Sequence, residues 1–330
     1  MSKRILTGDR PTGKLHLGHY VGSLKNRLDL QDKNEVFLLV ADLHALTTNQ
    51  DTKELRQNIK NLVLDQLSVG IDPEKVSFCV QSQIPEAQEL FTIFSMLVSI
   101  KRLERIPTTM EVVRDLGIKN ITLGLRAYPV LQAADIMMVR ANLVPVGKDQ
   151  ASHLELTREI VKEFNRTYKE VFPIPEALIP KDVGSLPGID GKAKMGKSLN
   201  NAIYLSDDKS VVKKKVMKMY TDPTRIHSTD PGHVKGNPVF IYLDAFAAGK
   251  DKSKVEDLKE KYEKGKVGDV QVKEFLTQVL NRFLDPIRDR RTKLEQEKGM
   301  VEKILGEGTK KARSRAVETL DLVKEAMNLQ

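Results

Sequence analysis

The sequence has little cysteine and no long hydrophobic run. Its one cysteine, Cys79, excludes an intrachain disulfide and lies in the apolar run 76–80, which favours a buried strand thiol over a reactive one. The longest apolar stretch, near residues 91–100, is too short and interrupted to span a bilayer, so we expect no membrane segment. Residues 1–6 include basic side chains but no apolar segment of the required length follows them, so we expect no secretory signal. Tryptophan is absent, which by itself decides nothing. A reducing, cytoplasmic setting is therefore expected.

What is present is a basic, globular composition. The 330 residues are 40% hydrophobic and 30% charged, enough for one large or two medium domains. The formal net charge of +9 fits a polyanionic partner such as RNA, although charge alone does not establish one.

The first two thirds of the chain alternate between strand-like and helix-like patterns. Apolar runs of strand length lie at residues 4–7, 36–40, 76–80 and 143–146, and helical patterns lie at residues 16–31, 55–67 and 152–168. Asp51 and Glu54 resemble a capping box before the second of these helices. This order predicts an α/β fold with a Rossmann-like, doubly wound parallel sheet, whose ligands bind beyond the carboxyl ends of the strands.

Two regions depart from this alternation. Residues 84–127 are helical in pattern and predict a helical insertion, and from residue 206 onward charged helical patterns replace the strands. We therefore predict a Rossmann-like catalytic domain at residues 1–205 and a C-terminal α-helical domain at residues 206–330.

The first candidate phosphate loop, residues 8–14, follows the first predicted strand. It nearly matches the P-loop pattern G-x-x-x-x-G-K-[ST], but Leu15 stands where the magnesium-binding hydroxyl belongs, and Pro11 removes a backbone N–H. His16 and His19 begin the following helix on one face, near the positive end of its dipole, which favours phosphate. The alternative is a surface helix with two exposed histidines.

The second candidate phosphate loop, residues 191–198, matches the P-loop pattern in full. A P-loop needs a buried strand before it and a helix after it, whereas here loop residues precede the pattern and helix-unfriendly residues follow it. We interpret it as a mobile loop in which Lys194 and Lys197 present point charges to a leaving pyrophosphate.

Taken together, the two loops resemble the paired signatures of class I aminoacyl-tRNA synthetases. The signatures are Leu15-His16-Leu17-Gly18-His19 and Lys194-Met195-Gly196-Lys197-Ser198. The family usually has serine where this chain has Gly196, which loses a hydroxyl contact and adds flexibility. Residues 7–13, 128–136 and 144–158 are similar to tryptophanyl-tRNA synthetases, closest to their diverged second bacterial form, and the resemblance covers nearly the whole chain.

This resemblance implies a tryptophan–tRNA ligase, which activates L-tryptophan with ATP, releases pyrophosphate and transfers tryptophan to the 3′ end of tRNA(Trp). It implies Mg²⁺ beside ATP, no metal bound by the chain itself, tRNA (anticodon) binding by residues 206–330, and a homodimer joined near residues 91–121. The residues implied to contact ATP are Arg10, Pro11, Thr12, Gly18, His19, Gly147, Lys148, Asp149, Leu186, Lys194, Met195, Gly196, Lys197 and Ser198. The residues implied to stabilise charge during the reaction are His16, His19, Lys194 and Lys197. Those implied to frame tryptophan are Asp135, Tyr128, Gln132, Gln150 and His44.

Asp135 is the residue expected to select the amino acid. It lies in an apolar helical segment, where a buried carboxylate needs a partner and suits the donor-only N–H of an indole ring. Such a site would reject phenylalanine by roughly 10⁴-fold or more. An ion pair with a neighbouring arginine or lysine is the structural alternative.

Other functions stay open at this point. Tyr128, Gln132 and Asp135 also have the spacing of the tyrosine-binding residues in tyrosyl-tRNA synthetases, and common bacterial tryptophanyl enzymes usually carry methionine where Gln132 stands. Residues 7–13 and 147–150 nevertheless favour tryptophan. The alternative functions are therefore a tyrosine–tRNA ligase, a nucleotidyltransferase that makes a small-molecule adenylate, and a P-loop NTPase.

Overall fold

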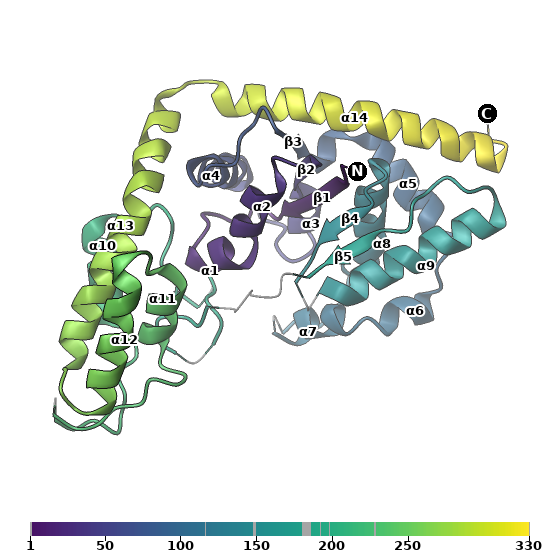
Figure 1. The fold of residues 1–330 in the computed structure, drawn as a ribbon. Coiled ribbons are helices and arrows are strands. Elements are labelled where there is room, and N and C mark those ends of the chain that lie inside the picture. Colours follow the sequence, from purple (N-terminus) through teal and green to yellow (C-terminus); the bar gives the residue numbers. More distant parts are fainter. Residues whose placement is uncertain are drawn as a thin grey trace.

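The fold is built on one parallel sheet. The computed structural model describes residues 2–115, 117–147, 150–179, 186–191, 193–197, 199–227 and 229–329. Five parallel strands lie in the order β3-β2-β1-β4-β5 (Figure 1). They are β1 (Arg4–Asp9), β2 (Glu35–Val40), β3 (Val76–Val80), β4 (Leu143–Pro145) and β5 (Glu176–Leu178). The predicted α/β class with a Rossmann-like parallel sheet is confirmed, and β5 is a strand that the sequence pattern did not indicate.

Each central strand contributes to two cores, one on either face of the sheet. In β2, Val36 and Leu38 lie in one core, whereas Phe37 and Leu39 lie in the other. This burial on both faces explains the continuous apolar runs in the sequence. Helix α4 (Leu55–Ser68) lies in the first core, and α8 (Leu123–Met138) and α9 (Ala151–Thr167) lie in the second. Cys79 is fully buried in β3, and burial raises the pKa of its thiol, as expected of an inert strand cysteine.

The helix predicted at residues 16–31 is divided into three parts. Helix α1 (Leu17–His19) passes into a wider π-helical segment, η1 (Tyr20–Leu24), and α2 (Lys25–Leu30) resumes the α-helix. Such π-helical turns are rare and often lie at functional sites. Here the wider turn directly follows the two histidines of the first candidate phosphate loop.

The start of α4 differs from the prediction. The Glu54 N-cap makes no side-chain capping bond, and Asp51 instead accepts a hydrogen bond from the Lys53 amide (3.0 Å). The predicted capping box is therefore wrong. A short 3₁₀ turn, η2 (Gln81–Gln83), precedes the region predicted as a helical insertion. The insertion itself contains α5 (Pro85–Ser95), α6 (Ile100–Glu104), α7 (Pro107–Asp115) and the start of α8. One further short helix, α3 (Asp42–Ala45), follows β2.

From residue 206 onward, the regular elements among the described residues are all helices. Its helices are α10 (Lys209–Met217), α11 (Pro238–Phe246), α12 (Lys250–Glu263), α13 (Asp269–Gln296) and α14 (Met300–Met327). Helices α10 to α13 form a bundle beside the sheet (Figure 1). The domain boundary at residue 206 stays a prediction. No described helix has both the length and the apolar character needed to cross a membrane.

Helix α14 leaves this bundle and runs along β3, the outer strand of the sheet (Figure 1). The Thr309 hydroxyl accepts a hydrogen bond from the Val80 amide (3.0 Å). The helix comes so close at Gly308 that a Cβ there would lie 2.0 Å from the carbonyl oxygen of Phe78. The last helix thus covers the edge of the sheet of the predicted catalytic domain.

Candidate active site

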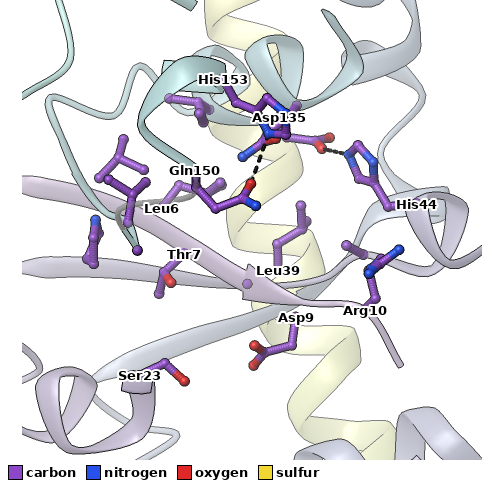
Figure 2. A pocket seen from close by; sticks show the side chains of 18 of the residues that line it. Leu6, Thr7, Asp9, Arg10, Ser23, Leu39, His44, Asp135, Gln150 and His153 are labelled. Carbon is purple, nitrogen blue, oxygen red and sulfur yellow. Dashed lines mark hydrogen bonds and ion pairs between the residues drawn. The ribbon is translucent and has the colours of Figure 1, made fainter. Parts of the chain in front are cut away.

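A cavity of about 460 Å³ lies at the carboxyl ends of β1 and β4, where the strand order reverses. The predicted site residues in its lining are Arg10, Thr12, His19, His44, Tyr128, Gln132, Asp135, Gly147 and Gln150. Figure 2 shows Asp135, His44, Gln150 and His153 together at one end of the cavity, with Asp9 and Ser23 toward the other. The fold therefore brings together predicted residues from both halves of the Rossmann-like region.

Asp135 is a buried acceptor at this first end. It is 1% exposed, and its Oδ2 lies 2.9 Å from His44 Nε2 and accepts a hydrogen bond from Gln81 Nε2 (2.8 Å). Its Oδ1 is also buried and has no hydrogen-bond partner among the described residues. Burial raises the pKa of Asp135, while His44 and Gln81 oppose that shift. The partners of Asp135 are thus a histidine and an amide rather than an arginine or lysine.

Gln81 is a functional candidate that the sequence analysis missed. Its Oε1 accepts hydrogen bonds from the backbone amides of Leu43 (3.1 Å) and His44 (3.2 Å), which fixes its amide so that Nε2 points at Asp135. One signal was available, because Gln81 directly follows the last residue of β3, at the edge where ligands of such sheets bind.

Three polar side chains continue this end of the cavity. Tyr128 Oη lies 3.2 Å from His153 Nε2, and His153 Nδ1 lies 2.9 Å from Gln150 Oε1 (Figure 2). His153 is 1% exposed. Burial raises the pKa of Tyr128, which therefore keeps its hydroxyl proton at neutral pH. His153 was named only as part of a resembling segment, and the structure adds it to the site as the link between two predicted residues.

The two candidate phosphate loops meet in space. Lys197 Nζ donates hydrogen bonds to Thr12 Oγ1 (3.2 Å) and to the carbonyl oxygen of Gly13 (2.9 Å). Met195 is buried, and its Sδ accepts from the Gly18 amide at 3.4 Å. Burial lowers the pKa of Lys197 to about 8, although Asp9 raises it. Residues of both loops therefore lie in contact, with the Lys197 ammonium group between them.

His16 is buried and His19 is half-buried, so neither histidine is exposed. His16 is 6% exposed, its Nδ1 has no hydrogen-bond partner among the described residues, and its ring centroid lies 3.8 Å from that of His19. Burial lowers the pKa of His16 to about 3 and that of His19 to about 4. Both rings are thus neutral at pH 7 and can donate one hydrogen bond each. The alternative of a surface helix with two exposed histidines is wrong.

Asp9 and Arg27 form an ion pair that the sequence did not indicate. Arg27 is 4% exposed, and its Nη1 lies 2.5 Å from Asp9 Oδ2. Burial alone would raise the pKa of Asp9, but Arg27 outweighs it and the pKa is lowered overall. The cavity therefore contains a fixed carboxylate at the carboxyl end of β1.

Several predicted ATP contacts lie outside the cavity lining or outside the described chain. Lys194 is exposed in this conformation, and the Gly196 amide donates to Asn201 Oδ1 (2.9 Å). Leu186 is buried and its carbonyl accepts from the Met195 amide (3.1 Å), so it supports the second loop. Pro11 is buried within the first loop. The predicted residues Lys148, Asp149 and Ser198 lie outside the described residues.

The surroundings of the second loop do not match a P-loop. In the described residues on either side, Pro187 and Lys194 form an isolated antiparallel bridge, and the next helix, α10, starts at Lys209. A P-loop requires a buried strand directly before it and a helix directly after it. The geometry thus favours two loops that share one site over an independent nucleotide-binding loop.

Residues 2–285 match the family of tRNA synthetases class I (W and Y). The chain belongs to this family. Among named relatives, the tryptophan–tRNA ligase of Treponema pallidum is 51% identical over 329 residues, covering 99% of this chain and 97% of the relative. The tryptophan–tRNA ligase of Streptococcus pyogenes (serotype M1) is also 51% identical, and 98% of each chain is covered. The resemblance to tryptophanyl-tRNA synthetases is confirmed.

Solved structures agree with this family. The tryptophanyl-tRNA synthetase of Campylobacter jejuni complexed with ADP and tryptophan has a TM-score of 0.87 and 35% identity, covering 99% of this chain and 100% of that one. The tyrosyl-tRNA synthetase of Archaeoglobus fulgidus has a TM-score of 0.68 and 23% identity, covering 88% and 90%, which shows a shared fold alone.

Proposed function

We propose that this protein activates L-tryptophan with ATP, releases pyrophosphate and transfers the tryptophanyl group to the 3′ end of tRNA(Trp), the reaction of a tryptophan–tRNA ligase. The observation that carries this proposal is the buried Oδ1 of Asp135, which has no hydrogen-bond partner among the described residues, in a cavity at the strand ends. An indole N–H is a donor without acceptor capacity and is the group such an oxygen needs. The names of the relatives, tryptophan–tRNA ligases at 51% identity, support the same amino acid.

In this proposal the amino acid and ATP occupy opposite ends of the cavity. Asp135 accepts from the indole, while Tyr128, Gln132, Gln150 and His44 frame the amino acid. The phosphates lie toward His19 and Lys197, next to Arg10 and Thr12. Gly147 is the part of the neighbouring strand-end loop that lines the cavity, and Lys148 and Asp149 are proposed from resemblance alone.

The reaction proposed here needs no covalent bond to the protein. A carboxylate oxygen of tryptophan attacks the α-phosphorus in line, the bond between that phosphorus and the bridging oxygen breaks, and pyrophosphate leaves with the electron pair. His16 and His19 are neutral and donate hydrogen bonds to the phosphates, whereas Lys197 supplies a charge. Lys194 is exposed and would come to the leaving group when the second loop closes.

Magnesium enters this proposal as a counter-ion of the ATP phosphates. The described residues contain no cluster of three or more histidine, cysteine, aspartate or glutamate side chains that could hold a metal. In this proposal the phosphate oxygens of ATP are the ligands of the magnesium ion, and the ion would neutralise part of the phosphate charge.

The helical region from residue 206 is proposed to contact tRNA. Not every lysine on and just after α10 is available, since Lys215 pairs with Asp207 (2.6 Å) and donates to the carbonyl of Ala202 (2.8 Å). Lys213, Lys214 and Lys218 remain candidates for the phosphate backbone.

A homodimer is also proposed. Met96 is 80% exposed, Ile100 is 71% exposed and Met110 is 44% exposed, all in the segment predicted as the interface. Large apolar side chains left open to water in one segment favour burial against a second copy. The cytoplasmic location stays a prediction.

The decisive experiment is ATP–pyrophosphate exchange with tryptophan and tyrosine measured side by side. The proposal expects exchange that depends on tryptophan and is far weaker with tyrosine. Exchange with tyrosine alone would transfer the proposal to a tyrosine–tRNA ligase, and exchange with neither would contradict the synthetase activity altogether.

A further inference from the structure

A buried carboxylate binds the backbone directly after the first candidate phosphate loop, just before His16. Asp65 is 0% exposed on helix α4, among the core residues Leu62, Leu64 and Leu67. Placing a carboxylate in such surroundings is costly unless each oxygen has a specific partner. A residue of this kind calls for a role beyond packing, and its two oxygens show what that role is.

The two oxygens of Asp65 contact different parts of the molecule. Oδ2 accepts a hydrogen bond from the backbone amide of Leu15 (2.7 Å), the residue before His16. Oδ1 forms an ion pair with Nη1 of Arg291, which comes from helix α13 of the helical region. Asp65 thus joins the loop with the two histidines to a helix more than two hundred residues further along the chain.

Arg291 is held in turn. It is 6% exposed, its Nη2 donates to Asn61 Oδ1 (3.0 Å), and its Nε donates to Glu295 Oε1 (2.8 Å). Its position is therefore set by α4 and α13 together. Figure 1 shows α13 rising from the bundle toward α4, the two helices that this contact joins.

The segment that Asp65 holds is also fixed on its other side. The Leu15 carbonyl accepts from the Leu205 amide (3.0 Å), and the Leu17 amide donates to the Ile203 carbonyl (2.9 Å). Leu15 is 2% exposed, so its amide needs a partner inside the protein. Without Asp65, one side of the segment that carries His16 loses its hydrogen bond.

We propose that Asp65 and Arg291 are positioning residues for the adenylation step, forming a clamp of Arg291, Asp65 and Leu15 through which the helical region fixes the backbone of the histidine-bearing loop at the ATP phosphates. The inference rests on the proposed function. Neither side chain lines the cavity, so the clamp acts on ATP through the loop and leaves the tryptophan end untouched. Asp65 is also among the carboxylates that help to keep Lys197 protonated.

The test uses the full-length protein and separates ATP from tryptophan. Arg291→Met removes the charge, and the kcat/KM for ATP in pyrophosphate exchange is expected to fall roughly tenfold or more, since the buried carboxylate loses its partner and the loop loses its support. The KM for tryptophan is expected to stay within about twofold. Arg291→Lys, which keeps a cation, should restore the ATP parameter to within about threefold of the original protein.

A matched control lies beside Arg291. Arg290 also joins α13 to α4, since its Nε donates to the carbonyl of Ser68 (2.6 Å), but this hydrogen bond does not involve Asp65 or Leu15. Arg290→Met should leave both parameters within about twofold. An equal loss of ATP efficiency in Arg290→Met would overturn the clamp, because any weakened contact between helices would then have the same effect.

A double variant separates positioning from stability. Replacing a buried ion pair by apolar residues often leaves stability unchanged. Asp65→Leu with Arg291→Met is therefore expected to melt no lower than Arg291→Met alone, while ATP efficiency stays reduced roughly tenfold because the Leu15 amide then lacks its acceptor. Normal ATP kinetics in this protein would overturn the proposal. If it does not fold, the comparison of Arg291→Met with Arg291→Lys decides, and equal ATP kinetics in those two would overturn it.

Failure of the proposed function would be recognised separately. It would appear as absent tryptophan-dependent exchange in the unchanged protein. Equilibrium binding of ATP alone to the same variants would still test the clamp, with weaker binding expected in Arg291→Met and not in Arg290→Met.

Discussion

Asp135→Asn is the substitution that most directly tests how the amino acid is selected. In the structure Oδ2 of Asp135 accepts a hydrogen bond from Gln81 and faces His44, while Oδ1 has no partner within the described part of the chain. An asparagine has one oxygen and one NH₂ group. Because Gln81 is fixed by the amides of Leu43 and His44, the asparagine oxygen must stay on that side and its NH₂ group must face the indole N–H.

The expected loss follows from two donors placed opposite each other. A hydrogen bond to a charged group contributes about 1.5–3 kcal/mol, and a buried unpaired donor costs about 1–3 kcal/mol. Together these give a loss of about 2.5–6 kcal/mol, or a decrease of roughly 10²–10⁴-fold in kcat/KM for tryptophan, at about 1.4 kcal/mol per factor of ten. The KM for ATP should change little.

Pyrophosphate exchange at varied tryptophan measures this change directly. Asp42→Asn is the matched control, because Asp42 is also a buried carboxylate but its oxygens accept from the Ser82 hydroxyl (2.5 Å) and amide (3.0 Å) and it does not line the cavity. We expect the control to stay within about threefold. An Asp135→Asn protein that kept its tryptophan efficiency within threefold would refute the hydrogen-bond reasoning.

Three further outcomes are expected. Burial has lowered the pKa of Lys197 to about 8, and Lys197 must be protonated to bind phosphate, so kcat/KM for ATP should fall as the pH rises through about 8. The Lys197→Arg protein should lack this alkaline decline. A decline in both proteins would assign the titration to another group. Gly308→Ala should lower the free energy of unfolding by about 2–3 kcal/mol in denaturant titration, because its Cβ would lie 2.0 Å from the Phe78 carbonyl oxygen. Gly306→Ala on the same helix meets nothing within 4 Å and should be neutral or slightly stabilising; equal losses in the two would contradict the packing argument. Lys194→Ala should lower kcat in pyrophosphate exchange more than it raises the KM for ATP, and a change in KM alone would contradict a role at the leaving group.

The sequence predicted those parts of the fold that leave a local pattern of apolar residues. Strands such as β2 are buried on both faces and therefore appear as continuous apolar runs, and α9 has a clear helical periodicity. By contrast, β5 has three residues and is stabilised by pairing with β4, so no local pattern marks it. The wide turn at Tyr20–Leu24 is likewise not marked in the sequence, because helical periodicity alone does not specify a π-helical turn.

The candidate site divides in the same way. His16, His19, Lys197 and Asp135 stand in motifs or in conspicuous surroundings, and could be selected before their positions were known. Gln81 could not be selected as a partner of Asp135, because they lie 54 residues apart and an amide after a strand has many possible roles. Such pairs become visible once the chain is folded.

Helix α14 has a consequence for how this chain is made. The outer edge of β3 is covered only when Thr309 reaches Val80, two contacting residues that are 229 positions apart. During synthesis, which proceeds at about 5–20 residues per second, the Rossmann-like part therefore leaves the ribosome with an open strand edge and waits for its cover. Open edges invite pairing with other chains. Helix α14, none of whose described residues lines the cavity, therefore protects the edge of β3 from pairing with other chains only once it has been synthesised and has docked.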